Sequence, residues 1–258
     1  METANKTSTV AACAQVFRLA LRRQFFSRQT IVTAVLLGLA LGITALWAYP
    51  MPWNPDPRTS AQLASRILSP LYMGFLLPII CLSYASAAIS GERSEQTLVY
   101  LLTTNIPRPL VYLAIYAAVL LLTLAVTLGG LSAICLVIGV KGLEALRVFS
   151  TVVACATVAY VGLFLLFSAW LRRATFLALA YALMIETLTG NIPGVVKRIT
   201  VSFYSKSWLY DPATSLGLKP IMGSYDPVSA ASAQWVMVLA SVGFLALGMW
   251  LFSRKEYD

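Results

Sequence analysis

The sequence has no histidine and few charged residues. Only 11% of its 258 residues carry a charge, and ten of these are acidic. Without histidine the chain lacks the base of Ser-His catalysis, the usual side chain for proton transfer and the commonest metal ligand. A soluble domain keeps about a quarter of its residues charged, whereas 59% of this chain is hydrophobic. The composition therefore predicts an all-α membrane protein in which residues 1–258 form a single membrane domain.

Paired cysteines are also missing. The cysteines are scattered along the chain and none forms a C-x-x-C pair, which argues against a zinc site or a disulfide framework. We interpret them as small packing residues, and we predict that this chain itself holds no metal and no cofactor. The four cysteines are Cys13, Cys81, Cys135 and Cys155.

Hydrophobic runs long enough to cross a bilayer occur six times. A helix needs about 20 apolar residues to cross the hydrocarbon core. The runs lie at 31–49, 70–89, 110–140, 148–171, 175–189 and 233–252. The third is longer than one crossing requires and should tilt or extend beyond the bilayer. Six transmembrane helices place both termini on the same side of the membrane.

The basic residues indicate which side that is. The net charge of +9 is concentrated beside the apolar runs, which favours a role in membrane orientation over nucleic-acid binding. The residues that flank the runs on the side of the termini are Arg18, Arg22, Arg23, Arg28, Arg93, Arg108, Arg172, Arg173, Arg254 and Lys255. By the positive-inside rule this side is the cytoplasm. We therefore predict a multi-pass protein of the cytoplasmic (inner) membrane with both termini cytoplasmic and no cleavable signal peptide.

Three segments of the sequence do not span. In residues 1–29, the stretch 11–29 alternates apolar side chains such as Val16 and Leu19 with arginines, which is typical of an amphipathic helix lying on membrane lipid. Residues 90–109 connect the second and third spans. Residues 190–232 form an external connection that is too apolar for a solvated loop and too rich in proline to span. That composition favours short interfacial or re-entrant helices between the fifth and sixth spans.

The connection 90–109 carries the most information. We expect the second span to leave the bilayer at Gly91, where the missing β-carbon eases a bend. An amphipathic helix follows, in which Leu98 and Leu101 share one face, and Pro107 ends it. Such a helix is joined directly to two crossings and could act as a lever on both. The residues alone equally allow a solvated turn whose charges merely keep it out of lipid.

The residues of this connection resemble a known family. The run Gly91-Glu92-Arg93, then Thr97-Leu98, Leu101-Leu102-Thr103 and Pro107-Arg108, is similar to the first cytoplasmic loop of type-2 ABC transporter permeases, the membrane subunits of the ABC-2 type family. Their common pattern is G-E-R-x-x-x-T-L-x-x-L-L-x-[TS], followed by a proline and a basic residue. Many members place that proline sooner after the Thr or Ser, so the end of the short helix differs here.

The resemblance implies that two kinds of subunit share the work. The membrane subunit of this family binds no nucleotide, and a separate ABC-type ATP-binding subunit binds ATP and Mg. This sequence likewise has no G-x-x-x-x-G-K-[ST] phosphate loop. The resemblance implies an export permease rather than an enzyme. A second permease copy and two ATPase subunits would complete the transporter. Closure of the ATPase subunits would then tilt the bundle between inward- and outward-facing states. The ATPase interface would be the coupling helix with Gly91, Glu92, Arg93, Glu95, Gln96, Thr97, Leu98 and Leu101.

Two further features lie inside predicted spans. Glu186 is the only carboxylate deep within one. One interpretation is that it handles substrate or protons. The other is a structural role, in which it pairs with Lys197 or Arg198 or binds backbone amides of the re-entrant segment. Gly38 and Gly42 form a G-x-x-x-G pair that permits close helix contact. We expect that contact to lie within the chain rather than in a dimer.

Other classes of function fit the sequence less well. A membrane-embedded enzyme requires clustered carboxylates or a nucleophile–base pair, and Glu186 stands alone. A secondary transporter or channel would show inverted repeats or several buried charges, and neither is evident. A permease-like subunit that transmits ATP hydrolysis to an extracytoplasmic partner, without moving a free solute, is not separated from export by these residues.

Overall fold

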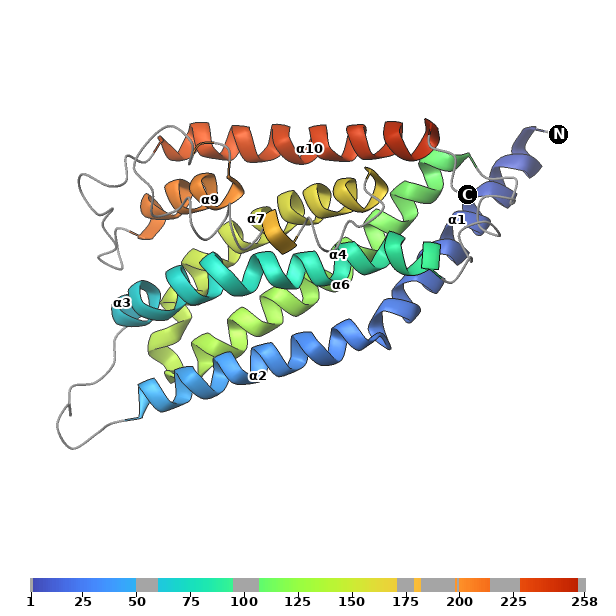
Figure 1. Ribbon diagram of the computed structural model, residues 1–258. Coiled ribbons are helices and arrows are strands. Elements are labelled where there is room, and N and C mark those ends of the chain that lie inside the picture. The colour runs from blue at the N-terminus through green and yellow to red at the C-terminus, as the bar shows by residue number, and fades with distance from the viewer. Residues whose placement is uncertain are drawn as a thin grey trace.

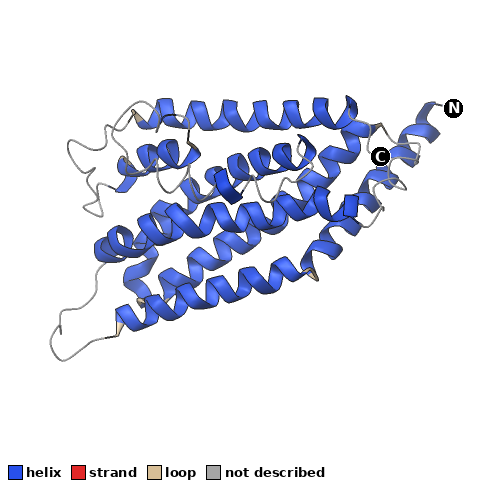
Figure 2. Ribbon diagram, in the orientation of Figure 1, coloured by secondary structure: helices blue, strands red, loops and turns tan. Residues whose placement is uncertain are grey.

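The chain folds as a bundle of helices. The computed structural model describes residues 2–49, 60–94, 107–170, 179–181, 198, 200–213 and 228–254. Within those ranges every regular element is a helix, and the long helices run side by side (Figure 1; Figure 2). The prediction of an all-α membrane fold is confirmed over this part of the chain, in which five stretches are long and apolar enough to cross a membrane.

The helix bounds follow most of the predicted spans. In chain order the elements are α1 (Glu2–Phe25), α2 (Arg28–Ala48), α3 (Ser60–Leu63), η1 (Ala64–Leu76), α4 (Leu77–Ser94), α6 (Arg108–Leu136), η2 (Gly139–Lys141), α7 (Gly142–Trp170), α9 (Val201–Tyr210) and α10 (Ala230–Arg254). The five membrane stretches correspond to the first four predicted spans and the sixth. The predicted span 175–189 lies outside the described residues, apart from 179–181, whose backbone is helical.

The second membrane stretch begins before the predicted start. The apolar run starts at Pro70, but the helical stretch runs from Ser60 to Ala88 and contains Pro70 within the π-helical element η1. Proline interrupts the hydrogen-bond ladder of an α-helix. Because a π-helix bonds each amide to the carbonyl five residues back, its wider winding lets the chain continue past Pro70. The predicted boundary was therefore wrong, although the span itself is present.

Helix α7 lies at the centre of the bundle. It packs against α4, α6, α9 and α10, and its side chains Phe149 and Phe164 are completely buried. Polar groups join it to its neighbours: Thr127 Oγ1 of α6 and Thr157 Oγ1 of α7 are 3.2 Å apart, and Tyr72 of η1 donates a hydrogen bond to the Thr127 carbonyl. Such hydrogen bonds and close packing hold membrane helices together, because lipid tails are as apolar as the helix surfaces themselves.

Helices α7 and α10 run in the same direction. A β-carbon on Gly162 of α7 would lie 3.3 Å from Cβ of Phe244 in α10. Closer to the start of both helices, Cys155 of α7 lines a cavity of about 390 Å³ with Gln234 and Met237 of α10. The residue numbers rise together along the two helices, so α7 and α10 are parallel, as Figure 1 also shows.

A short helix lies within the predicted external segment 190–232. Helix α9 begins after Thr200, whose hydroxyl accepts a hydrogen bond from the Phe203 amide at 3.2 Å, the arrangement of a helix N-cap. It packs against α7 and α10 at the end of the bundle where α10 begins. Its residues Ser202, Ser205 and Leu209 are buried. The segment therefore contains a helix that is covered by the bundle.

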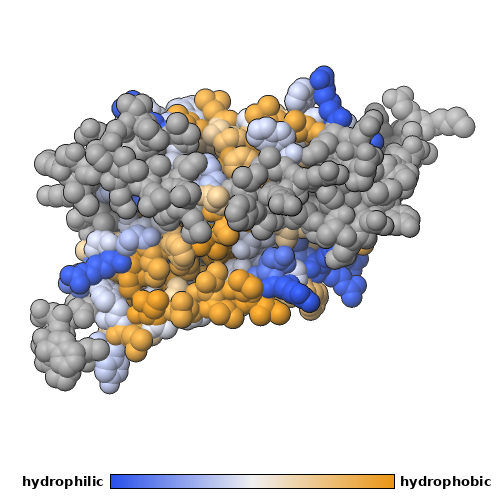
Figure 3. Space-filling view, in the orientation of Figure 1, coloured by the Kyte–Doolittle hydropathy of each residue, from blue (hydrophilic) through white to orange (hydrophobic). Residues whose placement is uncertain are grey.

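Apolar side chains cover the sides of the bundle. On the face shown in Figure 3 an apolar band lies between hydrophilic residues at the two ends. Helix α2 adds exposed Val35, Leu39 and Leu46 to the outer surface, and α10 adds Val242 and Leu247. Apolar surfaces of this extent contact either lipid or another membrane chain. The bundle thus has the outer surface that a membrane protein requires.

Candidate functional site

The first two helices meet in a sharp bend that we call the elbow, residues 24–30. The sequence predicts one amphipathic helix over 11–29, but α1 ends at Phe25 and α2 begins at Arg28. Ser27 Oγ and Thr30 Oγ1 both donate hydrogen bonds to the Gln24 carbonyl, at 2.7 and 2.8 Å. Because these hydroxyls bind a carbonyl that a continuing helix would use, they end α1 early. The predicted bounds of this helix are therefore corrected.

The elbow is bound to α4 by two side chains. Gln24, which is only 6% exposed, donates from Nε2 to the Tyr84 carbonyl at 3.0 Å. Tyr84 in turn places its hydroxyl 3.3 Å from Thr30 Oγ1. These contacts join residues about 60 positions apart in the sequence. Helix α4 is therefore in contact with both the end of α1 and the start of α2.

Helix α4 carries the beginning of the predicted coupling motif. Gly91, Glu92 and Arg93 form its last turn, and the helix continues without a break to Ser94. Helical backbone therefore continues through Gly91, where the sequence predicts that the span leaves the bilayer. The motif ends at Pro107-Arg108, where α6 begins. The two ends of the motif thus belong to two long helices, α4 and α6, at the end of the bundle where α1 begins and α10 ends (Figure 1); we call this the terminal end.

The remaining predicted interface residues cannot be placed. Residues 95–106 lie outside the described part of the chain. They include Glu95, Gln96, Thr97, Leu98 and Leu101. Glu186 also lies outside the described residues, so its two alternative roles both stay predictions.

A second contact joins α4 to the central helix α7. Ser168 of α7 is 1% exposed, and its hydroxyl lies 3.3 Å from the Ala85 carbonyl of α4. Ala85 follows Tyr84, so adjacent carbonyls of α4 contact the elbow and the central helix; the Ser168 hydroxyl also lies 2.9 Å from the Phe164 carbonyl of its own helix. Helix α4 therefore contacts α1, α2 and α7 through these groups, and its last turn carries the start of the motif; we call this set of contacts the mechanical junction.

The G-x-x-x-G pair in α2 faces outward. A β-carbon added to Gly38 or Gly42 would meet no described atom within 4 Å, and both glycines are exposed. The expected packing against another helix of the same chain is not found among the described residues. The pair therefore lies on the outer surface of α2, next to exposed Leu39 and Ile43.

Sequence reasoning missed the residues of the elbow. The one indication in the sequence is a polar residue on an apolar helix face. Gln24 follows Val16 and Ala20 at intervals of four, so it lies on the buried face of α1. A polar side chain on such a face needs a partner, but the sequence does not say which helix supplies it. Tyr84 was equally hard to identify, because it is the Tyr84 backbone carbonyl that binds Gln24.

We expect Gln24→Leu to loosen α1 from α4. The substitution removes the bond to the Tyr84 carbonyl, and hydrogen bonds between membrane helices average about 0.6 kcal/mol. Amide hydrogen exchange in residues 22–27 should therefore rise about threefold. Tyr84→Phe is the matched control, because it removes only the hydroxyl contact with Thr30 and leaves the Gln24 bond intact. Equal exchange in Gln24→Leu and wild type would contradict the role of this bond.

Comparison with known proteins finds a family model that covers most of the chain. A family model described as "ABC-2 family transporter protein" matches residues 21–194, more than half of the chain. The matched region begins just before the elbow and includes the whole coupling motif. No curated protein matches the chain.

Proposed function

Because the chain belongs to the ABC-2 family of transporter proteins, we propose that it is the permease subunit of an ATP-driven exporter. Membership makes it a membrane subunit without an ATPase domain of its own, and it implies an ATP-binding partner subunit. In this proposal the partner docks on the coupling motif at the terminal end. The observation that carries the proposal is that the motif begins in the last turn of α4 and ends at the start of α6.

The mechanical junction supports this assignment. A partner that pushed on Gly91–Arg93 would displace α4, and the Gln24–Tyr84 bond would pass that displacement to the elbow. The Ser168–Ala85 contact would pass it to α7. Tilting of packed helices about such contacts is a common form of domain movement in switching proteins. Closure of the ATPases would thereby alternate the bundle between inward- and outward-facing states.

The parallel arrangement of α7 and α10 supports a six-span topology. Since both helices run toward the terminal end, the chain returns to the opposite end between them. Helix α9 already lies at that opposite end, so the return falls between Trp170 and Val201. The predicted span 175–189 occupies this interval, and the short helix α9 suits a re-entrant element. With the arginines of α1 and Arg254 at the terminal end, the positive-inside rule places this end in the cytoplasm.

The outward-facing glycines support a second permease copy. Small residues on a lipid-facing surface let two helix backbones approach closely, and Gly38 and Gly42 leave open space on α2. We therefore assign this face of α2 to contact between permeases, in either a homodimer or a heterodimer. The sequence alone favours packing of these glycines within the chain, whereas their exposed position favours contact between two permease copies.

The test is coexpression of the chain with a candidate ABC-type ATPase subunit. We expect the two to copurify and the pair to hydrolyse ATP. The double variant Glu92→Lys/Arg93→Glu should lose at least about tenfold of the bound ATPase, because reversing charges at an interface places like charges together. Copurification that is unaffected by this reversal would contradict docking at the motif.

A matched control is available at the opposite end. Glu144 and Arg147 are exposed charges in the first two turns of α7. The double variant Glu144→Lys/Arg147→Glu should leave copurification unchanged. ATPase assays of the assembled complex with candidate solutes, and separately with candidate extracytoplasmic proteins, distinguish export from mechanical transmission to a partner. Stimulation by a solute supports export, whereas stimulation only by such a protein supports transmission.

A further inference from the structure

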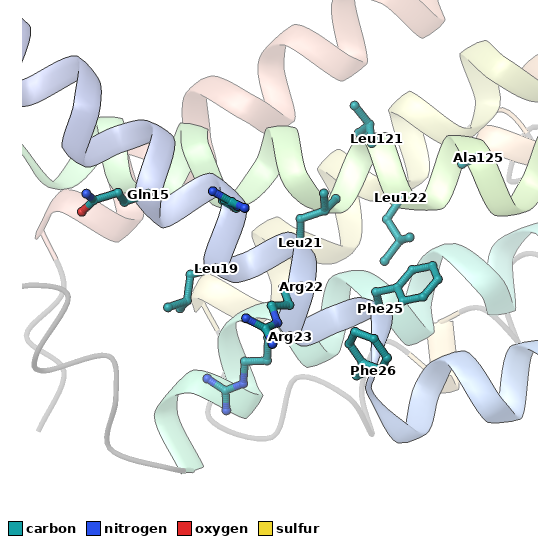
Figure 4. A pocket seen from close by; sticks show the side chains of 11 residues that line it. Gln15, Leu19, Leu21, Arg22, Arg23, Phe25, Phe26, Leu121, Leu122 and Ala125 are labelled. Carbon is teal, nitrogen blue, oxygen red and sulfur yellow. The ribbon is translucent and has the colours of Figure 1, made fainter.

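A groove of about 1150 Å³ lies between α1 and α6 beside the elbow (Figure 4). Its α1 wall includes Arg18, Arg22 and Phe25, and its α6 wall includes Leu121 and Ala125. Volumes of several hundred Å³ are typical of sites for small ligands, so the groove is large enough for a lipid-sized molecule. It belongs neither to the coupling motif nor to the glycine face of α2.

The charge of the groove has one sign. The titratable side chains among its described lining residues are all arginines, at 18, 22 and 23, and none is acidic. Arg18 and Arg22 are exposed, so their guanidinium groups are accessible to a ligand. A guanidinium group presents several N–H donors in a fork that matches the oxygens of a phosphate. The groove is therefore complementary to an anion with phosphate oxygens.

The other half of the groove is apolar. Leu121 is 53% exposed and follows Arg108, the first residue of α6, by 13 positions, or about 20 Å along the helix. In Figure 4, Arg22 and Arg23 extend to one side of α1, and Leu121 and Ala125 of α6 lie on its other side. Because α6 is long and apolar enough to cross a membrane, we place this apolar half of the groove against the hydrocarbon chains of lipid.

We propose that this groove binds one anionic diacyl phospholipid from the leaflet at the terminal end. Its phosphate accepts hydrogen bonds from Arg18 and Arg22, and an acyl chain lies along Phe25, Leu121 and Ala125. The bound lipid fills the space between α1 and α6, next to the elbow. The position of α1 then depends on the anionic lipid content of the membrane. This proposal is independent of the ATPase partner and of any transported solute.

The experiment uses the full chain in nanodiscs of phosphatidylcholine that contain a trace of phosphatidylglycerol with a photoreactive acyl chain. After illumination, mass spectrometry should locate adducts in residues 15–26 and 118–128. Unlabelled phosphatidylglycerol should compete for labelling, and additional phosphatidylcholine should not. Arg18→Gln/Arg22→Gln should lower labelling at these sites by about tenfold to thirtyfold, since each basic residue near an anionic surface strengthens binding roughly fivefold.

Two further variants keep the test decisive. Arg28→Gln removes an exposed arginine of α2 that does not line the groove, and it should leave labelling unchanged. Leu121→Trp keeps every arginine but fills the apolar half, so it should also lower labelling; its exposed position protects the fold. Labelling spread evenly over the lipid-facing helices, equal loss in Arg28→Gln, or full competition by phosphatidylcholine would overturn the proposal.

Discussion

Gly142→Ala is expected to destabilise the protein by about 3 kcal/mol or more. Gly142 is buried at the turn between α6 and α7, and an added β-carbon would overlap the carbonyl oxygen of Cys135 and lie 2.7 Å from its carbon. That carbonyl also accepts the Ile138 amide at 3.3 Å. Because the obstacle is backbone, no side chain can rotate away, and the turn has to open. A turn that opens separates α6 from the central helix α7.

The measurement is thermal unfolding of the purified full chain in detergent, with size-exclusion profiles to detect aggregation. The midpoint of Gly142→Ala should fall by roughly 6–12 °C. Gly129→Ala is the matched control, since Gly129 lies on an exposed part of α6 and a β-carbon there meets no described atom within 4 Å. It should be neutral or slightly stabilising, because alanine favours a helix more than glycine does. Equal unfolding midpoints for Gly142→Ala and Gly129→Ala would contradict the close contact between position 142 and the Cys135 carbonyl.

Gly248→Ala should separate α10 from α6 at the terminal end. A β-carbon on Gly248 would lie 2.6 Å from Cζ of Tyr112. Tyr112 is fully buried, and its ring centroid lies 5.5 Å from that of Phe252 in α10, so the phenol ring has no free space to move into. Overpacking of this kind costs about 1–3 kcal/mol. Thermal unfolding in detergent should show a corresponding fall in the midpoint.

Position 243 in the same helix provides the control for this prediction. Gly243→Ala meets no described atom within 4 Å and should unfold like the wild type or slightly above it. The closest atom to the added methyl group at 248 is the Tyr112 hydroxyl oxygen. Tyr112→Phe in the Gly248→Ala background should therefore recover part of the lost stability. Destabilisation without any recovery would show that the cause is not contact with Tyr112.

Much of the fold could be predicted because the solvent is lipid. A run such as 110–140 contains far more apolar residues than a soluble helix tolerates, so the helix α6 was recognisable from composition alone. The family was recognisable from the run that begins at Gly91 and ends at Pro107-Arg108. Boundaries were less predictable. The apolar run predicts a span that starts at Pro70, because the π-helical winding before and after this residue leaves no simple mark in the sequence.

The sequence by itself indicated a membrane subunit of the ABC-2 family, a family whose membrane subunits lack an ATPase domain, and the resemblance to that family lies in residues 91–108. Only the tertiary structure decided which surfaces meet. It turned Gly38 and Gly42 outward, bound Gln24 to the Tyr84 carbonyl and left a basic groove between α1 and α6. The physical reason is that lipid and the protein interior are both apolar. Hydrophobicity therefore marks which residues lie in the membrane, but does not distinguish a helix face covered by protein from one covered by lipid.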